Sequence, residues 1–162
     1  MGIANYYGFI TMVKVKDIMV KEVISVAPDA KVTEVAQLIS KYRIHGVPVV
    51  GKGKIVGIIT ETDFFVKDQP DIYLPSYIEF LNKAKFADKI SMGKRKTINK
   101  LIKAKAKDIM TADCFTVMPD LAVKELLKLI IAKHYFTIPV ADKDGKMVGI
   151  VTQNDILNII NL

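Results

Sequence analysis

Apolar residues recur three or four positions apart in two stretches of the chain, residues 32–42 and 123–131. This spacing places them on one face of a helix, so each stretch predicts an amphipathic helix. The apolar residues that form the two faces are Val32, Val35, Ala36, Ile39 and Tyr42 in the first stretch, and Val123, Leu126, Leu127, Ile130 and Ile131 in the second.

Short runs rich in β-branched residues flank both predicted helices. The runs ISV at 24–26 and FTV at 115–117 precede them. After the helices, VPVV at 47–50 and IPVA at 138–141 are each joined by a short turn to a second run, IVGIIT or MVGIVT, as expected for a β-hairpin. A Thr-x-x-Asp sequence follows each hairpin and predicts the start of a second, short helix. Each half of the chain therefore predicts the order β-α-β-β-α.

The two halves also repeat each other in sequence. KDIM at 16–19 returns at 107–110, and VAPD at 26–29 returns as VMPD at 117–120. Later in each half, GKIVGIITETD returns as GKMVGIVTQND. Matches that recur in the same order over a long stretch are the signature of a tandem duplication.

The duplication divides the chain into a first copy at 13–66, a connector at 67–106 and a second copy at 107–162. A unit with one sheet and two helices leaves an apolar face uncovered, so we expect the copies to pack about a pseudo-twofold axis. In the connector, Pro75 with SYIEFLNKAKFA predicts one helix, and KRKTINKLIKAKAK predicts a second, basic helix. The predicted fold class is α+β, with a helical insertion between two repeats.

Composition narrows the possible functions. The single cysteine, Cys114, excludes an internal disulfide, and we expect it to be a small buried hydrophobe in a protein of the reducing cytoplasm. The apolar stretch near the start is too short to span a membrane. The two histidines, His45 and His134, do not occupy equivalent positions, and no metal-binding, P-loop or nucleophile-base motif occurs. We therefore expect neither catalysis nor a metal site.

The net charge of +7 has a local origin. Residues 83–107 hold ten Lys or Arg residues and one acid, Asp88. The basic helix predicted there could bind nucleic acid or a protein partner. The competing interpretation is an ordinary solvated helix face, because lysine-rich surfaces are common.

The repeated Thr-x-x-Asp sequences carry the most specific chemistry. A carboxylate accepts hydrogen bonds from ribose hydroxyls, and a Thr hydroxyl with the first N–H groups of a helix suits phosphate. The same residues also form a near capping box, in which Thr and the acid only stabilise the start of the helix. Both interpretations remain open from these residues alone.

Taken together, KDIM, VAPD and VMPD, HGVPVV and TIPVAD, and GIITETD and GIVTQND resemble the cystathionine-β-synthase (CBS) domain family. The arrangement resembles the tandem pair called a Bateman module. The resemblance implies a regulatory protein that binds AMP, ADP, ATP or S-adenosylmethionine in clefts between the copies and transmits occupancy to a regulated partner.

The resemblance also implies which residues line the two clefts. Cleft A combines Ser25, Ile44, His45 and Val47 with Thr152, Asn154 and Asp155. Cleft B combines Thr116, Tyr135, Phe136 and Ile138 with Thr60, Thr62 and Asp63. His45 either meets phosphate or is a surface residue, and Tyr135 and Phe136 either line the cleft or belong to the core.

The clefts are expected to differ, and the module is expected to dimerise. Tyr135 replaces Ile44 at a position that lies against adenine in the resembling family, so cleft B should hold adenine more tightly. His45, with Arg43 nearby, should favour a more highly phosphorylated ligand in cleft A. Apolar residues after the two Thr-x-x-Asp sequences predict a homodimer. They are Phe64, Phe65, Ile156, Leu157, Ile159 and Ile160.

Overall fold

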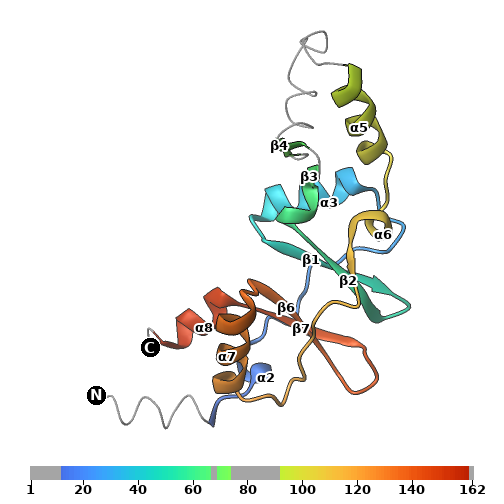
Figure 1. Ribbon diagram of the computed structural model, residues 1–162. Helices are drawn as coiled ribbons and strands as arrows, with labels where there is room; N and C mark the ends of the chain where they lie inside the picture. The colour runs from blue at the N-terminus through green and yellow to red at the C-terminus, as the bar shows by residue number, and fades with distance from the viewer. Residues whose placement is uncertain (1–11, 67–68, 74–91, 161–162) are drawn as a thin grey trace. The chain divides into compact units, whose positions relative to one another are not determined.

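The computed structural model describes residues 12–66, 69–73 and 92–160 (Figure 1). The described residues form two compact units. Unit 1 consists of the described residues within Met1–Ile24, Lys52–Ile55 and Phe115–Leu162. Unit 2 consists of the described residues within Ser25–Gly51 and Val56–Cys114. None of the described helices is both long and apolar enough to cross a membrane.

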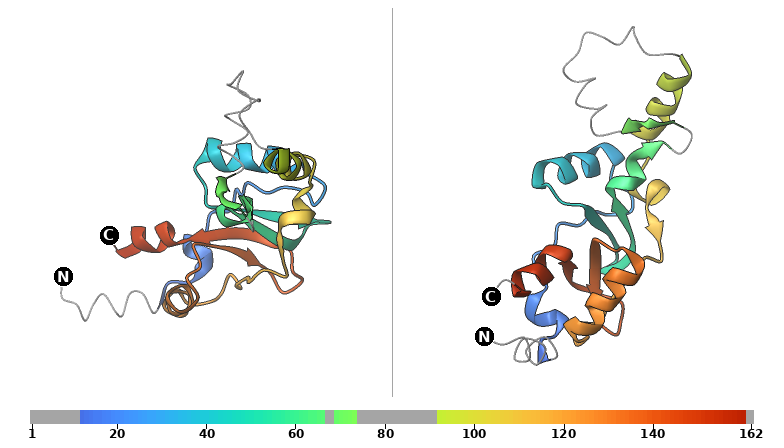
Figure 2. Two further views of the ribbon diagram at one scale, coloured as in Figure 1. Left: turned by 45° about the horizontal axis from the view of Figure 1, so that its top comes forward. Right: turned by 60° about the vertical axis from the view of Figure 1, so that its left-hand side comes forward.

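Unit 2 contains the helix and hairpin predicted for the first copy. Helix α3 (Val32–Tyr42) precedes strands β1 (Gly46–Gly51) and β2 (Lys54–Thr60), and the first two residues of β2 group with unit 1. Strand β5 (Thr111–Ala112) adds to β2, giving the sheet order β1-β2-β5. Helix α3 lies against β1 (Figure 2). The helix ends at Arg43, which adopts a left-handed backbone with φ of 51°.

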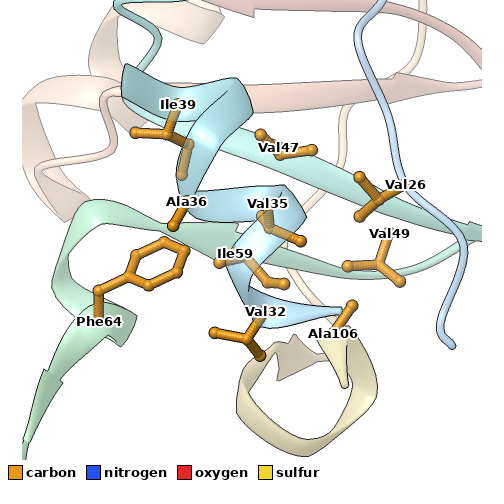
Figure 3. Packing of buried hydrophobic residues seen from close by; sticks show 10 residues of the cluster. All are labelled: Val26, Val32, Val35, Ala36, Ile39, Val47, Val49, Ile59, Phe64 and Ala106. Atoms are coloured by element: carbon orange, nitrogen blue, oxygen red, sulfur yellow. The ribbon is translucent and has the colours of Figure 1, made fainter. Parts of the chain in front are cut away.

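The buried face of α3 is the apolar face that the sequence predicts. Val32, Val35, Ala36 and Ile39 are buried, whereas Tyr42 is exposed at the end of the helix. They pack in one cluster (Figure 3) with residues of β1, of β2, of the turn after β2, of the segment before α3 and of the end of the connector, namely Val47, Val49, Ile59, Phe64, Val26 and Ala106. Burial of each large side chain in such a cluster contributes about 1.5–3 kcal/mol, so this core holds unit 2 together.

Unit 1 repeats the architecture with the second copy. Helix α7 (Val123–Lys133) precedes strands β6 (Thr137–Ala141) and β7 (Met147–Thr152), which pair antiparallel, and helix α8 (Gln153–Ile160) follows. The hairpin turn is fixed by the Asp142 carboxylate, whose Oδ1 accepts from the backbone N–H groups of Asp144 and Lys146, both at 2.9 Å. The core of unit 1 is formed by Val15, Val117, Val123, Leu126, Ile130, Ile138, Val140, Val151 and Ile156.

The KDIM segment of each copy belongs to the compact unit of the other copy. Helix α2 (Val15–Ile18) lies in unit 1, and helix α6 (Ala106–Ile109) lies in unit 2. The N–H of Lys16 donates to the carbonyl of Pro119 at 2.8 Å, and the N–H of Lys107 donates to the carbonyl of Pro28 at 2.9 Å. The proline turns therefore cap these short helices. The copies defined by sequence are not the units defined by packing.

In each unit, an aspartate that forms ion pairs with two lysines accompanies this exchange. Asp29 Oδ1 accepts from Lys107 Nζ at 2.9 Å and from Lys105 Nζ at 3.0 Å. Hydrogen bonds from Lys107 and then Lys105 lower the pKa of Asp29. In unit 1, hydrogen bonds from Lys16 and then Lys14 lower the pKa of Asp120 in the same way. All these groups are exposed, so the pairs orient the KDIM segments more than they stabilise the fold.

Several elements differ from the sequence expectations. The ISV and FTV runs, predicted as strands, each pair with their hairpin at a single residue. They form isolated parallel bridges, Val26 with Val49 and Val117 with Val140. In the first copy, the short helix predicted at Thr-x-x-Asp is a single 3₁₀ turn, η1 (Glu61–Phe64).

A hairpin that sequence analysis did not foresee joins the end of the first copy to the connector. Strands β3 (Phe65–Val66) and β4 (Gln69–Tyr73) pair antiparallel where a helical segment was expected. The basic helix is confirmed as α5 (Met92–Ile102). The helix predicted after Pro75 lies outside the described residues.

Both halves carry a glycine in the second strand of their hairpin, Gly57 in β2 and Gly149 in β7, and sterics explain why. Gly57 pairs with Ala112 of β5, and a Cβ at residue 57 would lie 2.7 Å from the Thr111 carbonyl oxygen and 2.8 Å from Met110 Sδ. At Gly149, the nearest atom to such a Cβ is Met19 Sδ at 2.6 Å, the end of a flexible side chain. Any larger residue at 57 must therefore displace backbone.

We expect Gly57→Ala to lower the free energy of unfolding by about 1–3 kcal/mol, because the added methyl group overpacks the β2–β5 contact. Urea denaturation measures this loss. Gly149→Ala should cost less, since Met19 can move aside. Gly93→Ala is the control: it lies in α5 with nothing within 4 Å of its Cβ position, and it should be neutral or slightly stabilising. Equal effects from all three would contradict the steric explanation.

Candidate functional site

The Thr-x-x-Asp turns are built alike in the two units. The N–H of Thr60 donates to Asp63 Oδ2 at 2.7 Å, and the Thr60 hydroxyl donates to the same oxygen at 3.0 Å. In unit 1, the N–H and hydroxyl of Thr152 donate to Asp155 Oδ2, both at 2.7 Å. The acid therefore caps the backbone of its own turn, and that part of the capping interpretation is confirmed in both copies.

Capping uses only one oxygen of each carboxylate. Within the described part of the chain, neither Asp63 Oδ1 nor Asp155 Oδ1 has a hydrogen-bond donor. A carboxylate offers about four lone-pair positions, so the second oxygen can accept from a ligand hydroxyl while the first holds the turn. Capping and ligand binding are thus compatible at the same residue.

The threonine hydroxyls of the first copy form a directed chain. Thr60 Oγ1 lies 2.8 Å from Thr62 Oγ1, and its own hydrogen is already donated to Asp63. Thr62 must therefore be the donor to Thr60. Both hydrogens are used inside the turn, which leaves Thr62 Oγ1 as an acceptor toward a ligand. The phosphate role expected for these hydroxyls requires that the chain first rearrange.

The helix dipole available to a phosphate also differs from expectation in the first copy. The turn η1 has four residues, so few peptide dipoles align behind Thr60. In the second copy the equivalent turn opens α8, which has eight residues. Phosphate binding at a helix start is thus poorly supported in the first copy.

His45 contacts the turn of its own copy. Its Nδ1 lies 3.2 Å from Glu61 Oε2, and its carbonyl accepts from the N–H of Glu61 at 3.3 Å. The imidazole side chain is 62% exposed. The structure thus joins a residue predicted for cleft A to the turn that carries Thr62 and Asp63, which were predicted for cleft B.

The second copy makes the corresponding connection with an amide. Gln153 occupies the position of Glu61 in the repeat, and its Nε2 donates to the carbonyl of Tyr135 at 3.2 Å. The N–H of Gln153 donates to the carbonyl of Phe136 at 3.3 Å. Each turn is therefore fixed to the strand segment of its own copy, by Glu61 in the first copy and by Gln153 in the second.

The remaining predicted site residues differ in exposure. The side chains of Val47 and Ile138 are buried in the cores, so only their backbone groups remain for a ligand. Ser25, Thr62, Phe136 and Asn154 are exposed, and Ile44, Thr116 and Tyr135 are half-buried. Each predicted cleft combines residues of both units, so the two clefts stay predictions.

A residue that sequence analysis overlooked stacks on Tyr135. The rings of Phe115 and Tyr135 lie 5.2 Å apart between centroids, with planes 14° from parallel. Tyr135 also packs against the core of unit 1, whereas Phe136 is 61% exposed. The core interpretation therefore holds in part for Tyr135 and fails for Phe136. Aromatic residues at 115 and 135 replace Ile24 and Ile44 of the first copy, and this paired change was a signal available in the sequence.

The remaining candidates from the sequence are the single cysteine, a metal site and the basic segment. Cys114 is half-buried where a fully buried residue was expected, and burial raises the pKa of its thiol. Across the described residues, no three His, Cys, Asp or Glu side chains gather in a way that could hold a metal ion. On the basic segment, Lys96, Lys100 and Lys103 are exposed. Nucleic-acid binding through that segment stays a prediction.

Substitutions at Asp63 test its role in capping the turn. We expect Asp63→Ala to lower the free energy of unfolding by about 1 kcal/mol, because the Thr60 N–H loses its acceptor. Asp63→Asn should lower it by less, since an amide oxygen can still accept that bond. Urea denaturation measures both. Asp144→Ala, at an exposed carboxylate of the β6–β7 turn, serves as the control, and a loss there as large as that of Asp63→Ala would argue against capping.

The chain matches known sequences over most of its length. The family model of the CBS domain matches residues 15–67 and 106–162. The uncharacterized protein MJ1426 of Methanocaldococcus jannaschii is 33% identical over 150 residues, which cover 88% of this chain and 88% of that protein. Inosine-5'-monophosphate dehydrogenase of the same organism is 30% identical over 145 residues, which cover 89% of this chain but 23% of that enzyme.

Solved structures share the fold. The CBS domain pair of protein MJ0100, in complex with 5'-methylthioadenosine and S-adenosyl-L-methionine, superposes with a TM-score of 0.63 and is 26% identical, covering 92% of this chain and 96% of that chain. Its α+β architecture agrees with the small antiparallel sheets and helices described above. The family model matches each sequence copy separately, which accounts for the duplication. The chain therefore belongs to the CBS domain family, and it carries two such domains in tandem.

Proposed function

We propose that the protein is a regulatory module that binds a small molecule containing adenosine. The observation that carries this proposal is the pair of Asp63 and Asp155 carboxylates, each fixed through Oδ2 while Oδ1 has no donor in the described part of the chain. The similarity to the MJ0100 pair, which was solved with 5'-methylthioadenosine and S-adenosyl-L-methionine, supports the ligand class. AMP, ADP, ATP and S-adenosylmethionine are the candidate ligands.

The geometry of the turns favours such a ligand energetically. Each acid is held by two donors before any ligand arrives, so little side-chain freedom is lost when a ribose hydroxyl donates to Oδ1. Thr62 Oγ1, left as an acceptor, can take a second ligand hydroxyl or an amino group. The side chains predicted for the two clefts, apart from the buried Val47 and Ile138, are the proposed surroundings of the base and phosphate.

The His45–Glu61 contact bears on which ligands the first copy accepts. Glu61 places a carboxylate 3.2 Å from the imidazole, at the start of the turn that holds Asp63. A ligand with several phosphates must compete with this carboxylate for the imidazole. Gln153 in the second copy carries no charge at the same position, so we propose that the two turns differ in their tolerance of ligand charge.

We propose a regulatory role without catalysis for this chain. A stretch similar to it makes up 23% of inosine-5'-monophosphate dehydrogenase, so sequences of this kind occur within an enzyme alongside a much longer remainder. The regulated partner of this protein is an unidentified protein to which ligand occupancy is transmitted.

Isothermal titration calorimetry with AMP, ADP, ATP and S-adenosylmethionine tests the function. We expect at least one to bind with a dissociation constant between micromolar and sub-millimolar, about −5 to −8 kcal/mol. Asp63→Ala and Asp155→Ala should each weaken or remove one binding event, because each deletes an acceptor for the ribose. Asp144→Ala should leave both events unchanged. Absence of both heat and thermal stabilisation with all four ligands would reject the proposal.

A homodimer is the second part of the proposal, with a smaller set of contact residues than the sequence indicated. Phe64 and Ile156 are buried in the cores of their own units and cannot contribute to a dimer. Leu157 of α8 is 51% exposed, and Phe65 is 44% exposed. Ile159 is half-buried, and the side chain of Ile160 lies outside the described ones. Leu157 is therefore the best-placed apolar contact among the residues first considered.

Light scattering measures the assembly directly. The chain mass is 18.1 kDa, and we expect a particle of twice this mass that Leu157→Glu shifts toward the monomer, because a charge there opposes burial of the helix face. Lys143→Glu, at an exposed hairpin turn, is the control and should leave the mass unchanged. A parent protein of 18.1 kDa at high concentration would exclude the dimer.

A further inference from the structure

The stacked pair of Phe115 and Tyr135 is the one place where aromatic side chains of the described residues stack in parallel. Phe115 remains 39% exposed, and Tyr135 is half-buried. The pair therefore keeps part of its surface accessible on unit 1.

The pair differs from the first copy as a matched set. Phe115 and Tyr135 stand where the first copy has Ile24 and Ile44, respectively. The residue after Phe115 keeps its character, since Thr116 corresponds to Ser25. Both partners of one contact have thus changed from aliphatic to aromatic together, which links their roles.

The backbone beneath Tyr135 is held firmly. His134 adopts a left-handed conformation with φ of 55° and ends α7, so the chain turns sharply there. The carbonyl of Tyr135 then accepts from Gln153 Nε2 at 3.2 Å, and the carbonyl of Phe136 accepts from the Gln153 N–H at 3.3 Å. With its backbone fixed, Tyr135 retains mainly the rotation of its side chain.

Phe115 restricts that remaining freedom. An offset, nearly parallel ring contact at 5.2 Å favours one orientation of the Tyr135 ring. A ring that is already oriented loses less entropy when a planar group stacks on it. Phe115 lies against the Tyr135 ring, and the part of the half-buried ring that stays exposed is what a planar group can reach.

We propose that Phe115 is a positioning residue that orients Tyr135 to stack the base of the bound nucleoside. This inference rests on the proposed adenosine ligand and adds a specificity element to it. Phe115 does not touch the ligand in this arrangement; it acts through Tyr135. The first copy, with isoleucines at both positions, offers apolar area without a flat ring, so the preference for a planar base belongs to the second copy.

Calorimetric titration with AMP tests the inference in a double-mutant cycle. Tyr135→Ile should weaken AMP binding by up to about tenfold, the value of one aromatic stack. Phe115→Ile should weaken it by a smaller factor. In the Tyr135→Ile background, Phe115→Ile should have no further effect, because the ring that it orients is gone. Phe115→Tyr keeps an aromatic ring and should restore parental affinity.

Tyr42→Ile is the matched control, since it removes a half-exposed aromatic ring from α3, outside the predicted clefts. It should leave AMP affinity unchanged. An undiminished effect of Phe115→Ile in the Tyr135→Ile background would show that Phe115 acts by another route and would overturn its positioning role. The same conclusion follows if the parent binds AMP and neither single variant weakens it. A parent that binds another of the four candidate ligands but not AMP would overturn this inference alone, whereas a parent that binds none of the four would overturn both this inference and the proposed function.

Discussion

The fold depends on the docking of each KDIM segment onto the proline turn of the other copy. The N–H groups of Lys16 and Lys107 donate to the carbonyls of Pro119 and Pro28. In unit 2 this docking brings β5 onto β2, and the close approach requires glycine at residue 57. Because β2 ends at Thr60, the same contact supports the strand from which the first Thr-x-x-Asp turn begins.

A single carboxylate in each unit fixes its Thr-x-x-Asp turn and, in the proposed function, also accepts a hydrogen bond from the ligand. Asp63 and Asp155 use one oxygen to fix the backbone of the turn, and this leaves the other oxygen in a fixed position. The environments then diverge: the first copy places a Glu61–His45 contact beside its turn, and the second places Gln153 and a stacked aromatic pair. A duplicated turn has thus acquired two different surroundings while its own hydrogen bonds stayed the same.

Local patterns in the sequence were enough to predict the elements whose causes are local. Helices α3 and α7 follow apolar spacing, and both long hairpins follow β-rich runs around short turns. The KDIM exchange was not predictable in this way, because it depends on backbone hydrogen bonds between segments about 80–100 residues apart, which any side chains could accompany. The β3–β4 hairpin escaped because β3 has only two residues and β4, QPDIY, has few of the β-branched and aromatic residues that indicate a strand. Among the site residues, Asp63 and Asp155 were predicted from the repeated motif. The direction of the hydrogen bonds from Thr62 to Thr60 and from Thr60 to Asp63 was not, because it depends on the folded geometry of the turn.

The exchange of KDIM segments has a consequence for how the chain matures during synthesis. Unit 2 gains its last strand only when residues 111–112 leave the ribosome, although its first strand and helix emerge far earlier. The N-terminal α2 must wait still longer, since its partners in unit 1 include Leu121 and Ile150. Neither half can complete its core as it emerges, so contacts distant in sequence have to form late. Apolar strand surface in both units therefore stays uncovered until segments far along the chain have been synthesised, which is the period when a growing chain is most exposed to aggregation.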